Sequence, residues 1–158
     1  MIDGPPDTLT IDAATEQLAE VRALVRAYAH NAGADEEAVS DLVQAVDELA
    51  CNVIEHGYAG RAGSIEIVLA RLDGGIQVRI RDAAPPFDPG TVPEPRLDLP
   101  LDQRPLGGMG VHLARTLTDG MDHRILPEGG NETTLTKLVR PTEARETDDG
   151  HHDGTTEP

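Results

Sequence analysis

The chain has 158 residues and a formal net charge of −16, because 29 Asp and Glu outnumber 13 Lys and Arg, and aromatic residues make up only 2%. This length suits one domain with its own core. So acidic a chain, poor in the aromatic side chains that stack on bases, argues against direct nucleic-acid binding and favours protein or small-molecule partners.

The single cysteine, Cys51, rules out an intrachain disulfide framework, and no Cys/His cluster has the spacing of a zinc site. The N-terminal segment is acidic where a secretory signal would be basic and then apolar, and no stretch approaches the roughly 20 apolar residues that span a bilayer. We therefore expect a cytoplasmic protein with no membrane association.

Two segments of the chain differ sharply in composition. Residues 1–140 carry the apolar patterning, whereas residues 141–158 contain almost no apolar side chains. Such a segment cannot bury enough surface to offset the entropy of ordering. We expect one folded domain over residues 1–140, followed by an acidic disordered tail.

Apolar periodicity predicts the elements of the N-terminal half. Alternation over residues 9–11 predicts a short strand, and helical spacing predicts a helix over 18–31. A second and longer helix is expected over about 35–56, because one apolar stripe runs along it until a glycine. Alternation over 65–69 and 76–80, on either side of an Asp-Gly-Gly turn, predicts a hairpin.

A proline-rich segment interrupts the pattern after the hairpin. Residues 83–106 contain seven prolines, so neither a helix nor an inner strand can persist there, and we expect a long loop. Glycine-rich residues 107–110 then open a short helix, and strand-like segments follow near 121–126 and 133–139. The order predicts an α+β fold, with helices packed on one face of a mixed, mostly antiparallel sheet.

Glu48 and Asn52 are four residues apart on the second predicted helix, so their side chains project from the same face. An Asn side-chain oxygen suits Mg²⁺, which takes one or two protein oxygens and completes its shell with waters and substrate phosphates. A carboxylate beside it can polarise an attacking hydroxyl. Taken alone, however, such a pair is usual on a hydrated helix face.

Two further features have the chemistry of a nucleotide site. Asp82 closes the second hairpin strand ahead of a rigid turn, which suits a carboxylate that accepts a hydrogen bond from an adenine amino group; a turn-forming aspartate is the alternative. The run Gly-Gly-Met-Gly over 107–110 leaves N–H groups free for phosphate oxygens, although such glycines also serve tight turns. The run matches neither a Walker A motif nor a Rossmann fingerprint.

The order of these features resembles the GHKL superfamily of ATPases and kinases. Four segments carry the likeness: DELACNVIEHGY (47–58) as the N box, RDAAPPFDP (81–89) and PLGGMGVHLARTLTD (105–119) as the two glycine-region motifs, and GGNETTLTKLV (129–139) as the last motif. The likeness covers about residues 9–139. It implies the Bergerat-type two-layer sandwich as the fold.

Within that superfamily, the sequences NVIEHGY and GGMGVHL are similar to the anti-sigma-factor serine/threonine kinase family (RsbW/SpoIIAB-like). The resemblance implies a homodimeric enzyme that uses ATP and Mg²⁺ to phosphorylate a serine of a STAS-domain anti-anti-sigma factor and that sequesters a sigma factor. The alternative is a nucleotide-dependent interaction module with little kinase activity and a non-sigma partner. A detached histidine-kinase catalytic domain ranks last, because no helical pair with an acceptor histidine is present.

The resemblance also implies a role for each matching residue. Asn52 ligates Mg²⁺, and Glu48 is the general base toward the serine hydroxyl. Asp82 hydrogen-bonds the adenine amino group, with support from the hydroxyl of Thr133. The turn that borders the triphosphate comprises Gly108, Met109 and Gly110.

Two positions depart from the family pattern. Glu132 stands where a glycine usually precedes the threonine of the last motif, so the strand is expected to start differently and Thr134 to share the adenine role. The family's ATP lid, residues 91–106 here, often carries an arginine directly before the glycine run. In this chain Arg104 lies three residues ahead of Gly107, and it is the expected contact of the γ-phosphate.

Overall fold

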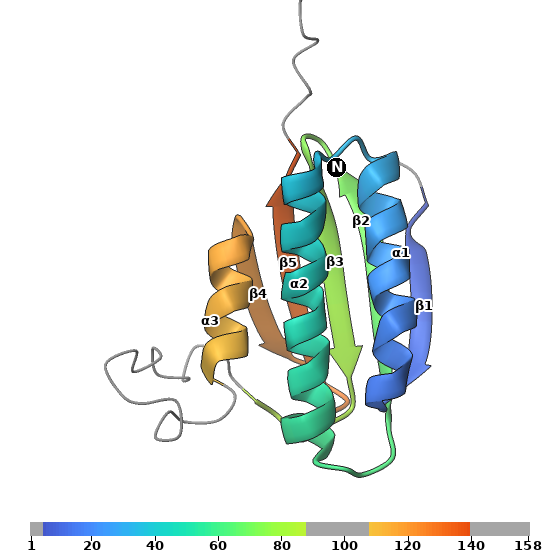
Figure 1. Ribbon diagram of the computed structural model, residues 1–158. Coiled ribbons are helices and arrows are strands. Elements are labelled where there is room, and N and C mark those ends of the chain that lie inside the picture. The colour runs from blue at the N-terminus through green and yellow to red at the C-terminus, as the bar shows by residue number, and fades with distance from the viewer. Residues whose placement is uncertain (1–4, 88–107, 140–158) are drawn as a thin grey trace, which may run out of the picture.

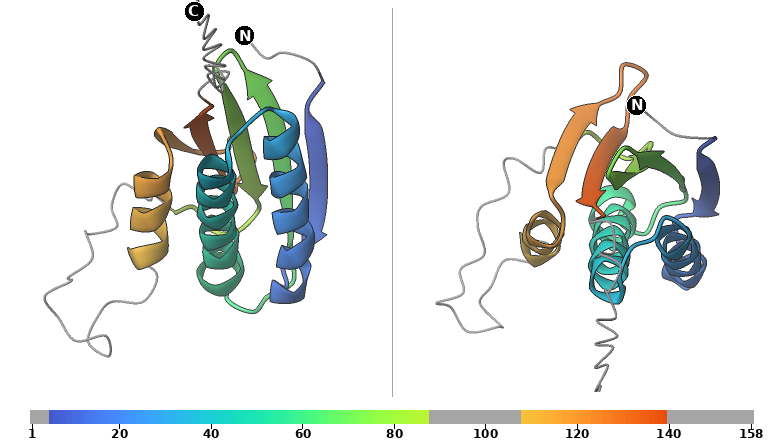
Figure 2. Two further views of the ribbon diagram at one scale, coloured as in Figure 1. Left: turned by 45° about the horizontal axis from the view of Figure 1, so that its top comes forward. Right: turned by 90° about the horizontal axis from the view of Figure 1, so that it is seen from above.

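The computed structural model describes residues 5–87 and 108–139, which form a layer of helices on one face of a five-stranded sheet (Figure 1). The view from above separates the two layers, with the labelled helices of Figure 1 all on the same side of the sheet (Figure 2). This arrangement confirms the predicted α+β, two-layer fold.

The N-terminal part contributes an edge strand and the first helix. Strand β1 (Asp7–Asp12) leads through a short 3-10 turn (Thr15–Gln17) into α1 (Leu18–Asn31). The buried side chains of α1 recur every three or four residues, and they are Leu18, Val21, Val25 and Ala29. Gly33 follows the helix with a φ of 85°, a left-handed conformation that is least costly for glycine.

Helix α2 (Glu36–Asn52) is the central helix of the layer. Asp35 caps it by accepting a hydrogen bond from the backbone N–H of Ala38 at 2.8 Å. Its buried stripe consists of Val39, Leu42, Val43, Ala45, Val46, Leu49 and Ala50. Beyond α2 the chain continues as a π-helix, η2 (Val53–Tyr58), and stops at Ala59 with a φ of 51°. The long predicted helix is therefore present, but its last turn is widened to the π form, which is frequent at functional sites.

Four more strands complete the sheet. Strands β2 (Ser64–Leu72) and β3 (Gly75–Asp82) form the predicted hairpin, and α3 (Gly108–Leu117) precedes β4 (Gly120–Ile125) and β5 (Asn131–Leu138). The strand order is β1-β2-β3-β5-β4, and the pairings between the described strands are all antiparallel. Because β5 lies between β3 and β4, the end of β3 meets the start of β5.

The two faces of the sheet differ in character. The face toward the helices carries the aliphatic core of β2, β3 and β5. On the other face, Arg81 pairs with Glu66 and Glu132, and Arg124 also pairs with Glu132. Hydrogen bonds from Arg124 and then Arg81 lower the pKa of the Glu132 carboxyl, against the opposing effect of burial. Glu132 therefore fits β5 as a paired charge on the face away from the helices.

Several expectations lie outside the described residues. The predicted tail, most of the proline-rich loop and the boundary at residue 140 all fall within residues 88–107 and 140–158. In the part of the chain that the structure describes, no helix combines the length and apolarity needed to cross a membrane.

Candidate functional site

Glu48 and Asn52 lie one turn apart on α2, and the first turn of α3 approaches them closely. A Cβ atom added at Gly110 would lie 3.0 Å from Asn52 Nδ2 and 3.1 Å from Glu48 Oε2. A side chain at this position would have to push both polar groups aside, so glycine is what permits the approach. The structure thus brings together three residues predicted at the phosphate end of the site.

The start of α3 contains two more of the predicted residues. Gly108 and Met109 are the first residues of this helix. The backbone N–H groups in the first turn of a helix have no intrahelical partner, so this end of α3 suits an anion. Arg104 and the predicted lid, residues 91–106, lie outside the described residues.

Asp82 is the last residue of β3, and its side chain is held in a fixed direction. The residue is 8% exposed, and its Oδ1 accepts hydrogen bonds from the Ala84 backbone N–H and from Asn131 Nδ2, both at 3.0 Å. Burial raises the pKa of the Asp82 carboxyl, while the hydrogen bonds from Asn131 and Ala84 oppose the rise. A buried, oriented carboxylate of this kind can accept a hydrogen bond from a ligand.

Asn131, the first residue of β5, binds the turn that follows Asp82, a role that sequence reasoning did not find. Its Oδ1 accepts from the backbone N–H of Phe87 at 2.8 Å, and its Nδ2 also donates to the Pro85 carbonyl at 3.1 Å. The backbone of Gly130 packs directly against β3, since a Cβ at this position would lie 2.1 Å from the Asp82 carbonyl oxygen. The sequence shows Asn131 only as a polar residue directly after a glycine pair, a pattern that is too common to assign this role.

Tyr58 fixes the same turn from the end of η2. Its hydroxyl donates to the Ser64 carbonyl at 2.7 Å and accepts from the Ala83 backbone N–H at 2.8 Å. Gly57 completes the contact, because a Cβ there would lie 3.1 Å from the Cβ of Ala84. The end of the π-helix therefore holds the segment that follows β3 in place.

Thr133 and Thr134 point to opposite faces of β5. Thr133 lies on the face toward the helices, where its Oγ1 lies 3.0 Å from Nδ1 of His123 on β4, the residue directly opposite in register. Thr134 shares the other face with Glu132, because side chains alternate along a strand. The structure therefore brings Thr133, but not Thr134, to the predicted adenine end, and it adds His123, which the motifs did not indicate.

A cavity of about 440 Å³ connects Asn52 with Asp82, His123, Asn131 and Thr133. Its lining residues are Leu49, Asn52, Val53, His56, Gly57, Arg61, Ile80, Asp82, Ala84, Pro85, Pro86, Phe87, Val111, His123, Asn131 and Thr133. The walls are largely apolar, with a few polar groups that converge from α2, β3, β4 and β5. Its size and character match those of small-molecule sites, which typically measure about 300–1,000 Å³.

The residues present fit a nucleotide with its metal ion. The buried Asp82 provides an acceptor for a base, and Asn52, against which the start of α3 packs, lines the same cavity and provides an amide oxygen for a metal ion. Among residues 5–87 and 108–139, no group of three or more His, Cys, Asp or Glu side chains is placed to hold a metal by itself. A metal ion at Asn52 would therefore depend on ligand oxygens, as Mg²⁺ commonly does.

Comparison with known proteins agrees with this geometry. Residues 11–137 match the protein family described as "Histidine kinase-like ATPase domain". The chain is 24% identical over 136 residues to "Serine-protein kinase RsbW" of Bacillus thuringiensis (strain Al Hakam) and 25% identical to the protein of that name from Bacillus anthracis (strain A0248), and each match covers 84% of both chains.

A solved structure is also similar. The crystal structure of the RsbU and RsbW domains of Rv1364c from Mycobacterium tuberculosis matches with a TM-score of 0.61 and 25% identity. The match covers 86% of this chain but 32% of that one, so the likeness concerns one part of the larger protein.

Proposed function

The chain belongs to the family of histidine kinase-like ATPase domains, and from this premise we propose that it is an ATP-dependent serine kinase that acts as an anti-sigma factor. It binds Mg²⁺ and ATP, phosphorylates a serine of a STAS-domain anti-anti-sigma factor, and sequesters a sigma factor while that partner is phosphorylated. The observation that carries the proposal is the approach of Gly110 to both Glu48 and Asn52. A module that only bound nucleotide would need no carboxylate beside the metal ligand.

Asp82 is the residue that we assign to the base. Both N–H donors that the described residues supply to this carboxylate bond to Oδ1, so Oδ2 is the oxygen for the amino group of adenine. The bond is charge-assisted when the carboxylate is ionised, and its direction is set by Asn131 and Ala84 before the ligand arrives.

Asn52 and the start of α3 form the phosphate end. The side-chain oxygen of Asn52 holds the Mg²⁺ ion, and the free N–H groups of the first turn of α3 donate to phosphate oxygens. Bound Mg-ATP supplies the phosphoryl group and the charges to be stabilised. The chain contributes orientation and fixed dipoles, which are the main terms in catalysis of phosphoryl transfer.

Glu48 is the group that takes the proton of the acceptor serine. Its carboxylate lies beside Gly110, one turn before Asn52, and the residue is partly exposed, so a partner's hydroxyl can reach it. General-base help of this kind is worth roughly 10²–10⁴-fold in rate. The named relatives, both serine-protein kinases, support the assignment of serine as the acceptor.

Phosphate transfer from labelled ATP tests the proposal. The protein is incubated with Mg²⁺, γ-labelled ATP and each STAS-domain protein encoded in the source genome, and the acceptor residue is identified by mass spectrometry. We expect labelling of one serine in one of these proteins, and labelling that is roughly 10²–10⁴-fold slower with Glu48→Gln. Binding of ATP without transfer to any candidate would favour the interaction module, and absence of ATP binding would overturn the proposal.

A further inference from the structure

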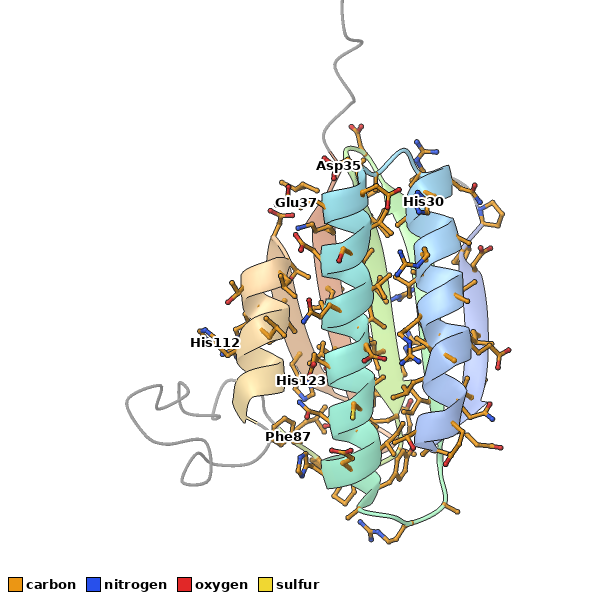
Figure 3. All side chains as sticks on the ribbon, in the orientation of Figure 1. His30, Asp35, Glu37, Phe87, His112 and His123 are labelled. Atoms are coloured by element: carbon orange, nitrogen blue, oxygen red, sulfur yellow. The ribbon has the colours of Figure 1, made fainter. Side chains whose placement is uncertain are left out.

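His123 has a polar atom that the described part of the protein leaves without a partner. The residue lies on β4 and lines the cavity together with Asp82 and Thr133. Its Nδ1 is 3.0 Å from Thr133 Oγ1, whereas its Nε2 is buried and has no hydrogen-bond partner among the described residues. Figure 3 shows His123 beside the C-terminal half of α2, with Phe87 nearby at the same end of the site.

The unpaired Nε2 of His123 beside the cavity indicates a hydrogen-bond partner that comes from a ligand. Buried polar atoms are almost always hydrogen-bonded, and one that is left unpaired costs free energy comparable to a lost hydrogen bond. Asp82 Oδ1 accepts from Ala84 and Asn131, and Thr133 contacts the other nitrogen of the ring. No described residue pairs with Nε2, and His123 lines the cavity, so a molecule bound there can supply the partner.

We propose that His123 contacts the bound nucleobase through Nε2 and is thus a second base-recognition residue beside Asp82. The inference rests on the proposed binding of ATP. In adenine the amino group is flanked by two ring nitrogens, N1 on one side and N7 on the other, and both are acceptors. A protein group that hydrogen-bonds the ring beside the amino group must therefore donate.

The tautomer that meets this requirement is available. When the hydroxyl of Thr133 donates to Nδ1, neutral His123 carries its proton on Nε2 and donates it to the ring nitrogen. Asp82 then accepts from the amino group and His123 donates to its neighbour. The two residues together select a purine that presents an amino donor beside a ring acceptor.

Atom-deleted nucleotides test the contact directly. The dissociation constants of ATP, 1-deaza-ATP and 7-deaza-ATP are measured by calorimetry in the presence of Mg²⁺ for the wild-type protein, His123→Phe and His123→Gln. We expect His123→Phe to weaken ATP binding about three- to tenfold, the worth of one hydrogen bond. His123→Gln, whose amide can donate, should recover part of the loss.

The analogue that lacks the contacted nitrogen identifies the bond. With that analogue, the wild-type protein and His123→Phe should bind with equal affinity, whereas the difference should persist with the other analogue. His112 offers a matched control, because this histidine is exposed on the neighbouring α3 and points away from the site (Figure 3). His112→Phe should bind all three nucleotides as the wild-type protein does.

Two results would overturn the assignment while ATP binding itself stands. Equal ATP affinity of the wild-type protein and His123→Phe would exclude the contact, and an equal loss with all three nucleotides would reduce His123 to a packing residue. If His123→Phe does not fold, as judged by its thermal unfolding, His123→Leu, which also cannot donate a hydrogen bond, takes its place with the same analogues. If the wild-type protein binds no ATP, the proposed function fails and this assignment fails with it.

Discussion

Substituting Gly110 by alanine should separate the stability of the domain from its ability to bind nucleotide. Gly110 is the third residue of α3, and glycine inside a helix costs about 0.5–1 kcal/mol relative to alanine. Against this gain, the new Cβ would contact Asn52 Nδ2 at 3.0 Å and Glu48 Oε2 at 3.1 Å. Both contacts are with the ends of flexible side chains, which can move by a few tenths of an ångström. We therefore expect unfolding stability that is unchanged or up to about 1 kcal/mol higher.

Nucleotide binding should respond in the opposite direction. Displacing Asn52 removes or misdirects one charge-assisted contact to the metal ion, and such a contact is worth about 1.5–3 kcal/mol. The affinity for Mg-ATP should fall by roughly 10- to 150-fold. Because the new Cβ crowds Glu48 as well as Asn52, the loss should persist at saturating Mg²⁺.

Thermal unfolding and calorimetric titration of Mg-ATP measure the two effects on the same preparation. Gly120→Ala is the matched control, since a Cβ there would lie 3.6 Å from the Cβ of Thr136, an ordinary packing distance on β4. It should leave ATP affinity unchanged. Wild-type ATP affinity in a stably folded Gly110→Ala variant would refute the assignment of the metal and phosphate end to Asn52 and the start of α3.

Four other changes test different parts of the protein. Asp82→Asn should cost about 1.5–3 kcal/mol of ATP binding in calorimetry. Because the pKa of Asp82 is raised on folding, its ionisation opposes folding as the pH rises through that pKa, so Asp82→Asn should leave unfolding stability near pH 7 unchanged or higher; a large loss of stability would contradict the argument. Glu48→Gln should keep ATP affinity but slow serine phosphorylation roughly 10²–10⁴-fold, whereas Asn52→Ala should weaken binding and turnover together; equal rates for Glu48→Gln and the wild-type protein would exclude the base. Truncation after Arg140 should leave the melting temperature and ATP binding nearly unchanged.

Elements with long periodic patterns could be predicted from the sequence alone. The apolar stripe of α2 fixes which face of that helix meets the sheet, and so it also fixes that Glu48 and Asn52 lie off that face. Asp82 was predictable as a strand end, because alternation stops where the prolines begin. Strand alternation, with Leu135 on the core face of β5, puts Thr133 and Thr134 on opposite faces, which the expectation that both serve the adenine did not take into account.

The rest of the site depends on contacts that no local pattern encodes. Asn131 meets Asp82 only because β5 inserts between β3 and β4, a pairing of residues 49 positions apart in the chain. His123 reaches Thr133 through the β4–β5 register, and a shift of one residue would turn its ring to the opposite face. The π form of η2 likewise follows from tertiary contacts, as Tyr58 is held by the backbone on both sides of the β2–β3 hairpin.

The distribution of hydrogen bonds makes the two ends of the site separable. At the base end, Tyr58 and Asn131 bind the segment after β3 from different elements, so the direction of the Asp82 carboxylate is fixed by η2 and β5 together. At the phosphate end, the approach of α3 to α2 depends on a glycine backbone. Changes at Asp82 should therefore act on affinity through the base, whereas Glu48 can be altered without disturbing any contact that orients the base. A kinase with this arrangement can lose phosphoryl transfer and still bind nucleotide, which is why transfer and binding have to be measured on the same variants.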